Sequence, residues 1–119
     1  MTGIDRATFD HIGVVTRETQ PGEAFVEATR VWVTSPRAHA FHVEFLRFAD
    51  DATLEGPVRN EPHVAFRVLD VEAAIAGHEL LLGPFDVGEG FVRVAFVRID
   101  GAVVEFMQYR DPNEEGWFS

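Results

Sequence analysis

Apolar and polar residues alternate along most of the chain, which predicts a protein built mainly of β-strands, because successive side chains of a strand point to opposite faces. Aromatic and β-branched residues are concentrated in the same stretches. Asp100-Gly101 lies between two of these stretches and suits a hairpin turn. The predicted strands cover residues 8–16, 25–34, 40–48, 62–68, 79–85, 91–99 and 102–109.

One segment has a helical period instead. In "LDVEAAIAGHELL" (69–81), Asp70 is suited to cap the first turn, and the apolar residues that follow fall on one face. The stretch "RETQPGEAF" (17–25) occupies the corresponding place in the first half, but Pro21-Gly22 should limit any helix there to about one turn. The polar stretch 49–61, which contains Gly and Pro, is predicted to be a linker.

The two halves of the chain repeat a pattern, which indicates an internal duplication. "DHIGVV" (10–15) parallels "PHVAFR" (62–67), since in both a His opens an apolar strand and a small residue follows two places later. "VEFLRF" (43–48) parallels "VEFMQY" (104–109) in the same order. We therefore expect a single domain over residues 1–119, with a first module at about 8–48, a linker at 49–61, a second module at about 62–109 and a tail at 110–119.

The amino-acid composition argues against several classes of function for this protein. The net charge of −10 disfavours nucleic acid or an anionic membrane as a partner, because both are bound through basic patches. The chain has no Cys and no Lys, which excludes thiolate chemistry and Schiff bases, and its Ser residues at 35 and 119 make a serine hydrolase a poor fit. Without a long apolar run or a signal-peptide pattern, a cytoplasmic location is expected.

The repeated His and Glu residues carry the candidate chemistry. By strand alternation, His11 shares a face with Phe9 and Gly13, and Glu44 and Glu105 lie among apolar neighbours on theirs. Two imidazoles and two carboxylates around one cavity would suit a divalent metal such as Zn, Ni, Co, Mn or Fe(II), since the carboxylates balance its charge. The plainer alternatives are strand-end histidines that make ordinary hydrogen bonds, and glutamates on a solvent-exposed sheet face.

These motifs resemble the vicinal oxygen chelate superfamily, which includes glyoxalase I, methylmalonyl-CoA epimerase, extradiol dioxygenases and bleomycin-resistance proteins. The resemblance covers about residues 8–109 and implies an α+β fold of two βαβββ modules that form a half-open, U-shaped mixed barrel. It also implies a metal held by His11, Glu44, His63 and Glu105. His11 to Glu44 spans 33 positions and His63 to Glu105 spans 42, so the first module should have a truncated helix.

The resemblance implies three function classes. The first is a metal-dependent lyase, isomerase or epimerase that acts on a small oxygen-rich substrate through a metal-stabilised enediolate, with Glu105 or Glu44 as the catalytic base. The second is a metal-free protein that binds or sequesters a small molecule, and the third is an Fe(II) ring-cleaving dioxygenase. A homodimer is expected, since the family often dimerises. The predicted substrate-binding residues are Arg67, His42, Phe9, Phe48, Met107 and Tyr109.

Overall fold

The computed structural model describes residues 7–117, in which eight strands form one mixed sheet. The strands are β1 (Thr8–Val15), β2 (Ala24–Val26), β3 (Val31–Val33), β4 (Val43–Phe48), β5 (His63–Arg67), β6 (Glu79–Val87), β7 (Val92–Ile99) and β8 (Ala102–Tyr109). The helices are α1 (Pro57–Asn60), α2 (Val71–Ile75) and a short 3-10 helix (Pro36–Ala38). None of the helices in this part of the chain is long and apolar enough to cross a membrane.

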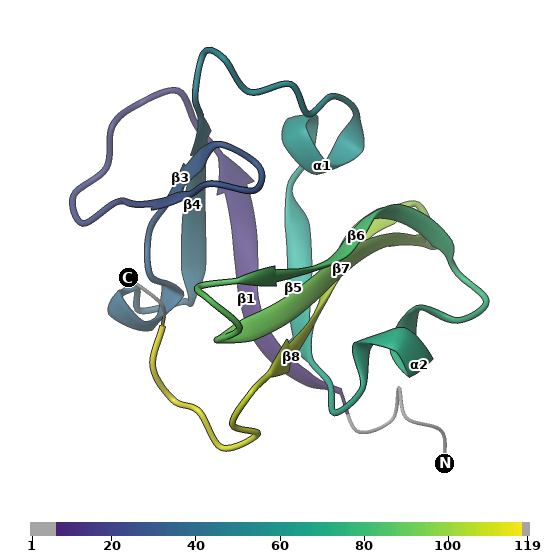
Figure 1. Cartoon of the computed structure of the whole chain (residues 1–119). Helices are drawn as coiled ribbons and strands as arrows, with labels where there is room; N and C mark the ends of the chain where they lie inside the picture. The colour runs from purple at the N-terminus through teal and green to yellow at the C-terminus, as the bar shows by residue number, and fades with distance from the viewer. Residues whose placement is uncertain (1–6, 118–119) are drawn as a thin grey trace.

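The two halves have the same strand order, which confirms the predicted fold class. The order across the sheet is β2-β3-β4-β1-β5-β8-β7-β6. In each half the first strand pairs in parallel with the fourth, and the remaining pairs are antiparallel. The halves join through the antiparallel pair β1–β5. Figure 1 shows β1 and β5 at the centre of the curved sheet, with the other strands to either side.

The two faces of the second half are buried in different ways. The inner face packs into a cluster that contains Val94, Phe96 and Met107, while the outer face is covered by α2, whose Val71 is fully buried against Ala95 and its neighbours. Asp70 caps α2 as predicted, because its carboxylate accepts a hydrogen bond of 3.2 Å from the backbone N–H of Ala73. The sheet therefore has an inner face on which a site can be built.

The structure departs from the sequence prediction at three places. The stretch 25–34 is two strands joined by a turn that ends at Arg30, whose φ is +51°. The predicted linker contains α1, which begins with Pro57 and buries Val58. Strand β4 begins at Val43 rather than at residue 40, because His42 has a φ of +56° and cannot continue the strand. No helix lies between β1 and β2, in keeping with the expected truncation.

Candidate metal centre

Four adjacent strands each bring one polar side chain to the same point on the inner face. His11 comes from β1, Glu44 from β4, His63 from β5 and Glu105 from β8, and these strands are neighbours in the order β4-β1-β5-β8. All four residues are buried, with at most 6% of their surface exposed. The plainer reading of exposed glutamates is therefore wrong.

The register explains why the four side chains meet. Gly13 is the backbone partner of both Glu44 and His63, and Ala65 is the partner of both His11 and Glu105. Each small residue thus lies between two of the polar ones and leaves room above it. A Cβ on Gly13 would lie 2.0 Å from Cε1 of the His63 ring, so the glycine is required for this arrangement.

The separations fit the ligand atoms of one metal ion. Nε2 of His11 lies 3.1 Å from Oε1 of Glu44, 3.3 Å from Oε1 of Glu105 and 3.3 Å from Nε2 of His63. Nε2 of His63 lies 3.2 Å from Oε1 of Glu105 and 3.7 Å from Oε1 of Glu44. All four atoms lie within 4.8 Å of one another. Ligand atoms bound at about 2.1 Å to one ion lie roughly 3.0–3.4 Å apart when the angle between their bonds is between about 90° and tetrahedral.

The donor chemistry also fits a divalent metal. Both histidines turn Nε2 toward the shared point, and each carboxylate turns one oxygen toward it. Nδ1 of His63 is buried and has no hydrogen-bond partner within the described residues. Two neutral nitrogens and two anionic oxygens suit Zn, Ni, Co, Mn or Fe(II).

A residue missed by the sequence analysis, Asp10, orients His11 from behind. Oδ1 of Asp10 lies 2.6 Å from Nδ1 of His11, which leaves Nε2 facing the other ligands. Oδ2 of Asp10 accepts hydrogen bonds of 2.9 Å from the Tyr109 hydroxyl and 2.9 Å from Nη2 of Arg37. A metal-binding histidine is commonly held in this way by a second carboxylate. The sequence did not predict this contact, because strand alternation places the neighbours Asp10 and His11 on opposite faces of the sheet.

The electrostatics of these groups follow from their hydrogen bonds. Burial alone would lower the pKa of His11, but the hydrogen bonds with Asp10, Glu105 and Glu44 raise it to about 12. Burial alone would raise the pKa of Glu105, but its bonds to His11 and His63 lower it to about 2. The metal-free site therefore contains a protonated His11 beside the ionised carboxylates of Asp10 and Glu105. His11 would have to lose this proton before an ion could bind there.

The two glutamates open onto a small apolar cavity, which we call the central pocket. It has a volume of about 60 Å³ and is lined by residues from strands of both halves and from α1. Phe48, a predicted substrate-binding residue, lines it, together with His63 and both glutamates. The rest of the lining is Val26, Thr29, Val31, Val33, Leu46, Leu54, Val58, Phe85, Val87, Val94 and Phe96. No arginine lines this pocket.

The other predicted substrate-binding residues lie elsewhere. Phe9, His42 and Arg67 line an open hollow of about 450 Å³ that also contains Asp10 and Arg37. Phe9 is 51% exposed, because a β-bulge between Phe9 and His11 turns it away from the face of His11. The prediction that these two residues share a face is wrong for that reason.

Arg67, Met107 and Tyr109 have structural partners. Arg67 lies 4.0 Å from the centroid of the Tyr109 ring and donates to the backbone carbonyls of Pro112 and Glu114, so it fixes the C-terminal segment. Met107 and Tyr109 are buried in the core. Their predicted contact with substrate stays a prediction.

The comparisons with known proteins agree with this fold. No family model matches the chain, and no curated protein matches its sequence. Among solved structures, it is similar to a hypothetical protein from Bacillus halodurans C-125, with a TM-score of 0.66 and 18% identity over 92% of this chain and 99% of the other. It is also similar to methylmalonyl-CoA epimerase from Mycobacterium tuberculosis, with a TM-score of 0.56 and 12% identity over 87% of this chain and 89% of the other. At these identities the likeness shows the fold alone, a mixed sheet curled into a half-barrel.

Proposed function

We propose that this protein is a divalent-metal-dependent enzyme of the glyoxalase and epimerase kind, which moves a proton at a carbon next to a carbonyl group. The observation that carries the proposal is the buried His/Glu/His/Glu group, whose two carboxylates open onto the central pocket. Burying two carboxylates beside apolar side chains is costly unless a cation balances them. A divalent ion bound there would polarise the oxygens of the substrate and stabilise negative charge on them.

The two glutamates have different surroundings, which suggests different roles. Oε1 of Glu105 lies within 3.3 Å of Nε2 of both His11 and His63. Oε1 of Glu44 lies 3.1 Å from Nε2 of His11 but 3.7 Å from that of His63. Glu44 is therefore held by one close contact and is the better candidate for the base that takes the proton, while His11, His63 and Glu105 hold the ion.

The shape of the central pocket supports a small reacting group. Its volume of about 60 Å³ is far below the roughly 300–1,000 Å³ of a site for a drug-sized ligand. Apart from His63 and Thr29, the pocket wall beyond the glutamates is apolar. We infer that the reacting end of the substrate is a short carbon unit with two adjacent oxygens directed to the ion.

Metal binding is the first test. Protein prepared without chelator is titrated with Zn²⁺, Ni²⁺ and Co²⁺ by calorimetry, in parallel with His11→Ala, His63→Ala, Glu44→Gln and Glu105→Gln. We expect one ion per chain and, in His11→Ala, His63→Ala and Glu105→Gln, a drop in affinity that exceeds the roughly 10–100-fold typical of outer-shell residues. Glu44→Gln should show a smaller drop, because Glu44 is held by one close contact. His78→Ala and Glu79→Gln change exposed residues of the same types and should bind as the parent does. Equal binding by all six variants would overturn the proposal.

Proton transfer is the second test. The metal-loaded protein is incubated in D₂O with small 2-hydroxy ketones, 2-oxo acids and 2-methyl thioesters, and deuterium at the carbon next to the carbonyl is followed by NMR. Exchange that is abolished in Glu44→Gln, while the ion remains bound, supports Glu44 as the base. Exchange that persists in Glu44→Gln and is lost in Glu105→Gln would instead assign that role to Glu105.

A metal-free binding protein fits the site less well. Apart from Thr29, the polar residues that line the central pocket are all of metal-ligand type, and the pocket is too small for a drug-sized molecule, which needs about 300–1,000 Å³. The expected homodimer stays a prediction, which light scattering coupled to gel filtration would check.

A further inference from the structure

Two arginines without ion-pair partners line the same pocket, although the chain has 20 acidic residues. Most arginines in residues 7–117 form ion pairs: Arg30, Arg37, Arg47, Arg67, Arg93 and Arg98. Within that range the exceptions are Arg17, Arg59 and Arg110. In so acidic a protein an unpaired guanidinium has many possible partners, so the presence of two in one pocket is unusual.

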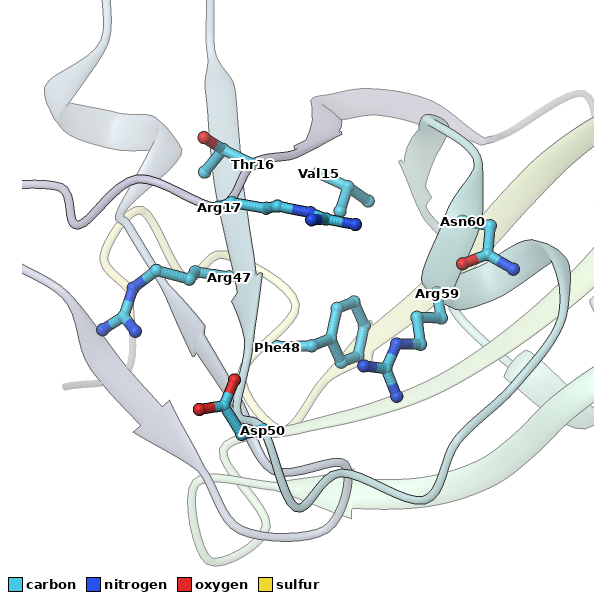
Figure 2. A pocket seen from close by; sticks show the side chains of 8 residues that line it. All are labelled: Val15, Thr16, Arg17, Arg47, Phe48, Asp50, Arg59 and Asn60. Carbon is cyan, nitrogen blue, oxygen red and sulfur yellow. The ribbon is translucent and has the colours of Figure 1, made fainter.

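This arginine pocket has a volume of about 570 Å³ and is lined by Val15, Thr16, Arg17, Arg47, Phe48, Asp50, Arg59 and Asn60. In Figure 2 the side chains of Arg17 and Arg59 extend toward the side of the pocket that contains Phe48, whereas Arg47 points the opposite way. Arg47 is already neutralised by Glu23, with contacts of 2.7 and 2.9 Å. The positive charge available to a ligand therefore comes from Arg17 and Arg59, and the Asp50 carboxylate in the same pocket opposes part of it.

Arg59 is held in place by contacts that leave donors free. Its Nη1 donates hydrogen bonds of 3.0 Å to the backbone carbonyls of Ala52 and Leu54, and its guanidinium lies 5.4 Å from the centroid of the Phe48 ring. Nε and Nη2 have no partner within the described residues. A guanidinium fixed in this way presents a fork of N–H donors that suits a phosphate or carboxylate group.

The arginine pocket adjoins the central pocket. The Phe48 side chain lines both, and α1 contributes Val58 to the central pocket and Arg59 to the arginine pocket. Phe48 follows Glu44 by four positions on the same face of β4, which is about 13 Å along a strand. A single elongated molecule could place one end at the glutamates and the other beside Arg59.

We propose that Arg17 and Arg59 bind the anionic end, a phosphate or carboxylate group, of the ligand whose reacting end lies beside Glu44 and Glu105. The part of this inference that concerns the reacting end rests on the proposed function. The anion site does not, because it is defined by its own residues. It assigns the substrate to a class with a metal-chelating head, an apolar middle and an anionic tail. In this arrangement Arg17 and Arg59, rather than the predicted substrate-binding residue Arg67, recognise the negative charge of the substrate.

The test begins with inorganic pyrophosphate and citrate as probes of the anion site, measured by calorimetry on metal-free protein, because both probes chelate divalent metals, at a constant ionic strength set with NaCl. Arg17→Gln changes a surface residue and should fold normally, and Arg59→Lys keeps the charge but removes the fork. We expect each to weaken binding of the preferred probe about tenfold or more, as expected for loss of charged hydrogen bonds. Arg110→Gln is the matched control, because it removes an unpaired arginine outside the pocket. Tighter binding of pyrophosphate identifies a phosphate site, and tighter binding of citrate identifies a carboxylate site.

Failure of this inference can be told apart from failure of the proposed function. Binding of the probes to the metal-free protein should be unchanged in Glu44→Gln. Absence of probe binding, or an equal effect of Arg110→Gln, would overturn the anion site while leaving the metal centre intact.

A series of 2-oxo acids with a terminal phosphonate or carboxylate on chains of increasing length then tests the span. Affinity should peak at an extended length near about 13 Å, and it should fall in both Arg17→Gln and Glu105→Gln. No dependence on chain length would overturn the single-ligand arrangement.

Discussion

Oδ1 of Asp10 lies 2.6 Å from Nδ1 of His11, and both residues are buried side by side at the bulge of β1. The contact fixes which nitrogen of His11 faces the other three ligand residues. Asp10 is itself held by Arg37 and Tyr109, so the orientation of one proposed ligand depends on residues from three separate parts of the chain.

Replacing Asp10 should therefore weaken metal binding without removing a ligand. In Asp10→Asn the side chain loses the charge that stabilises His11, and we expect the Zn²⁺ or Ni²⁺ dissociation constant to rise about 10–100-fold. Calorimetric titration measures the change. Asp100→Asn, at the exposed hairpin turn, is the control and should bind as the parent does. An unchanged affinity in Asp10→Asn would mean that His11 needs no partner for its orientation.

The sequence predicted the centre of the fold better than its edges. His11, Glu44, His63 and Glu105 were predicted because they recur in register, and a regular strand carries that register into space. Asp10 and Phe9 were not placed correctly, because the β-bulge between Phe9 and His11 shifts the alternation by one residue and no residue type marks it.

Contacts between distant segments explain the remaining differences. Arg67 lies on the expected strand, but its guanidinium is used by backbone carbonyls of Pro112 and Glu114, more than 40 residues further along the chain. The short α1 helix in the predicted linker depends on burial of Val58 against the core, which a local pattern does not reveal. Alternation reports which face a residue occupies, not which segment covers that face.

Enlarging Gly13 should disrupt the site from within. A Cβ in Gly13→Ala would meet the His63 ring at 2.0 Å, so the ring must move, and the fit of the four ligand residues is lost. We expect a destabilisation of about 1–3 kcal/mol in denaturant unfolding, together with a marked loss of metal affinity. The control is Gly116→Ala, whose added methyl would meet only the flexible Glu114 carboxylate, at 3.0 Å. Parent-like metal binding in Gly13→Ala would show that His63 is not needed in its present position.

Trp117 offers an optical signal for the same site. Its ring packs edge-on against His11, with the ring centroids 5.4 Å apart, whereas Trp32 packs against Phe25 in the first half. Because Ni²⁺, Co²⁺ and Cu²⁺ quench nearby indoles, their binding should reduce the fluorescence of Trp117. Trp32→Phe should retain the quenching, and Trp117→Phe should lose it. Quenching that survives in Trp117→Phe would place the ion away from His11.

The pKa of His11 makes the stability of the metal-free protein depend on pH. The pKa of His11 is about 12 in the folded chain, whereas the ordinary pKa of a histidine is 6.5. Above about pH 6.5 the folded state therefore holds a proton that the unfolded state has lost. The free energy of unfolding should therefore fall as pH rises, by up to about 1.4 kcal/mol per pH unit between about pH 7 and pH 9. A bound metal displaces this proton, so the metal-loaded protein should lack the slope, and metal affinity should rise with pH. Urea unfolding over this range, with and without Zn²⁺, measures both effects. His11→Gln should remove the slope in the metal-free protein, and a parent protein whose stability is equally flat with and without metal would contradict a protonated His11.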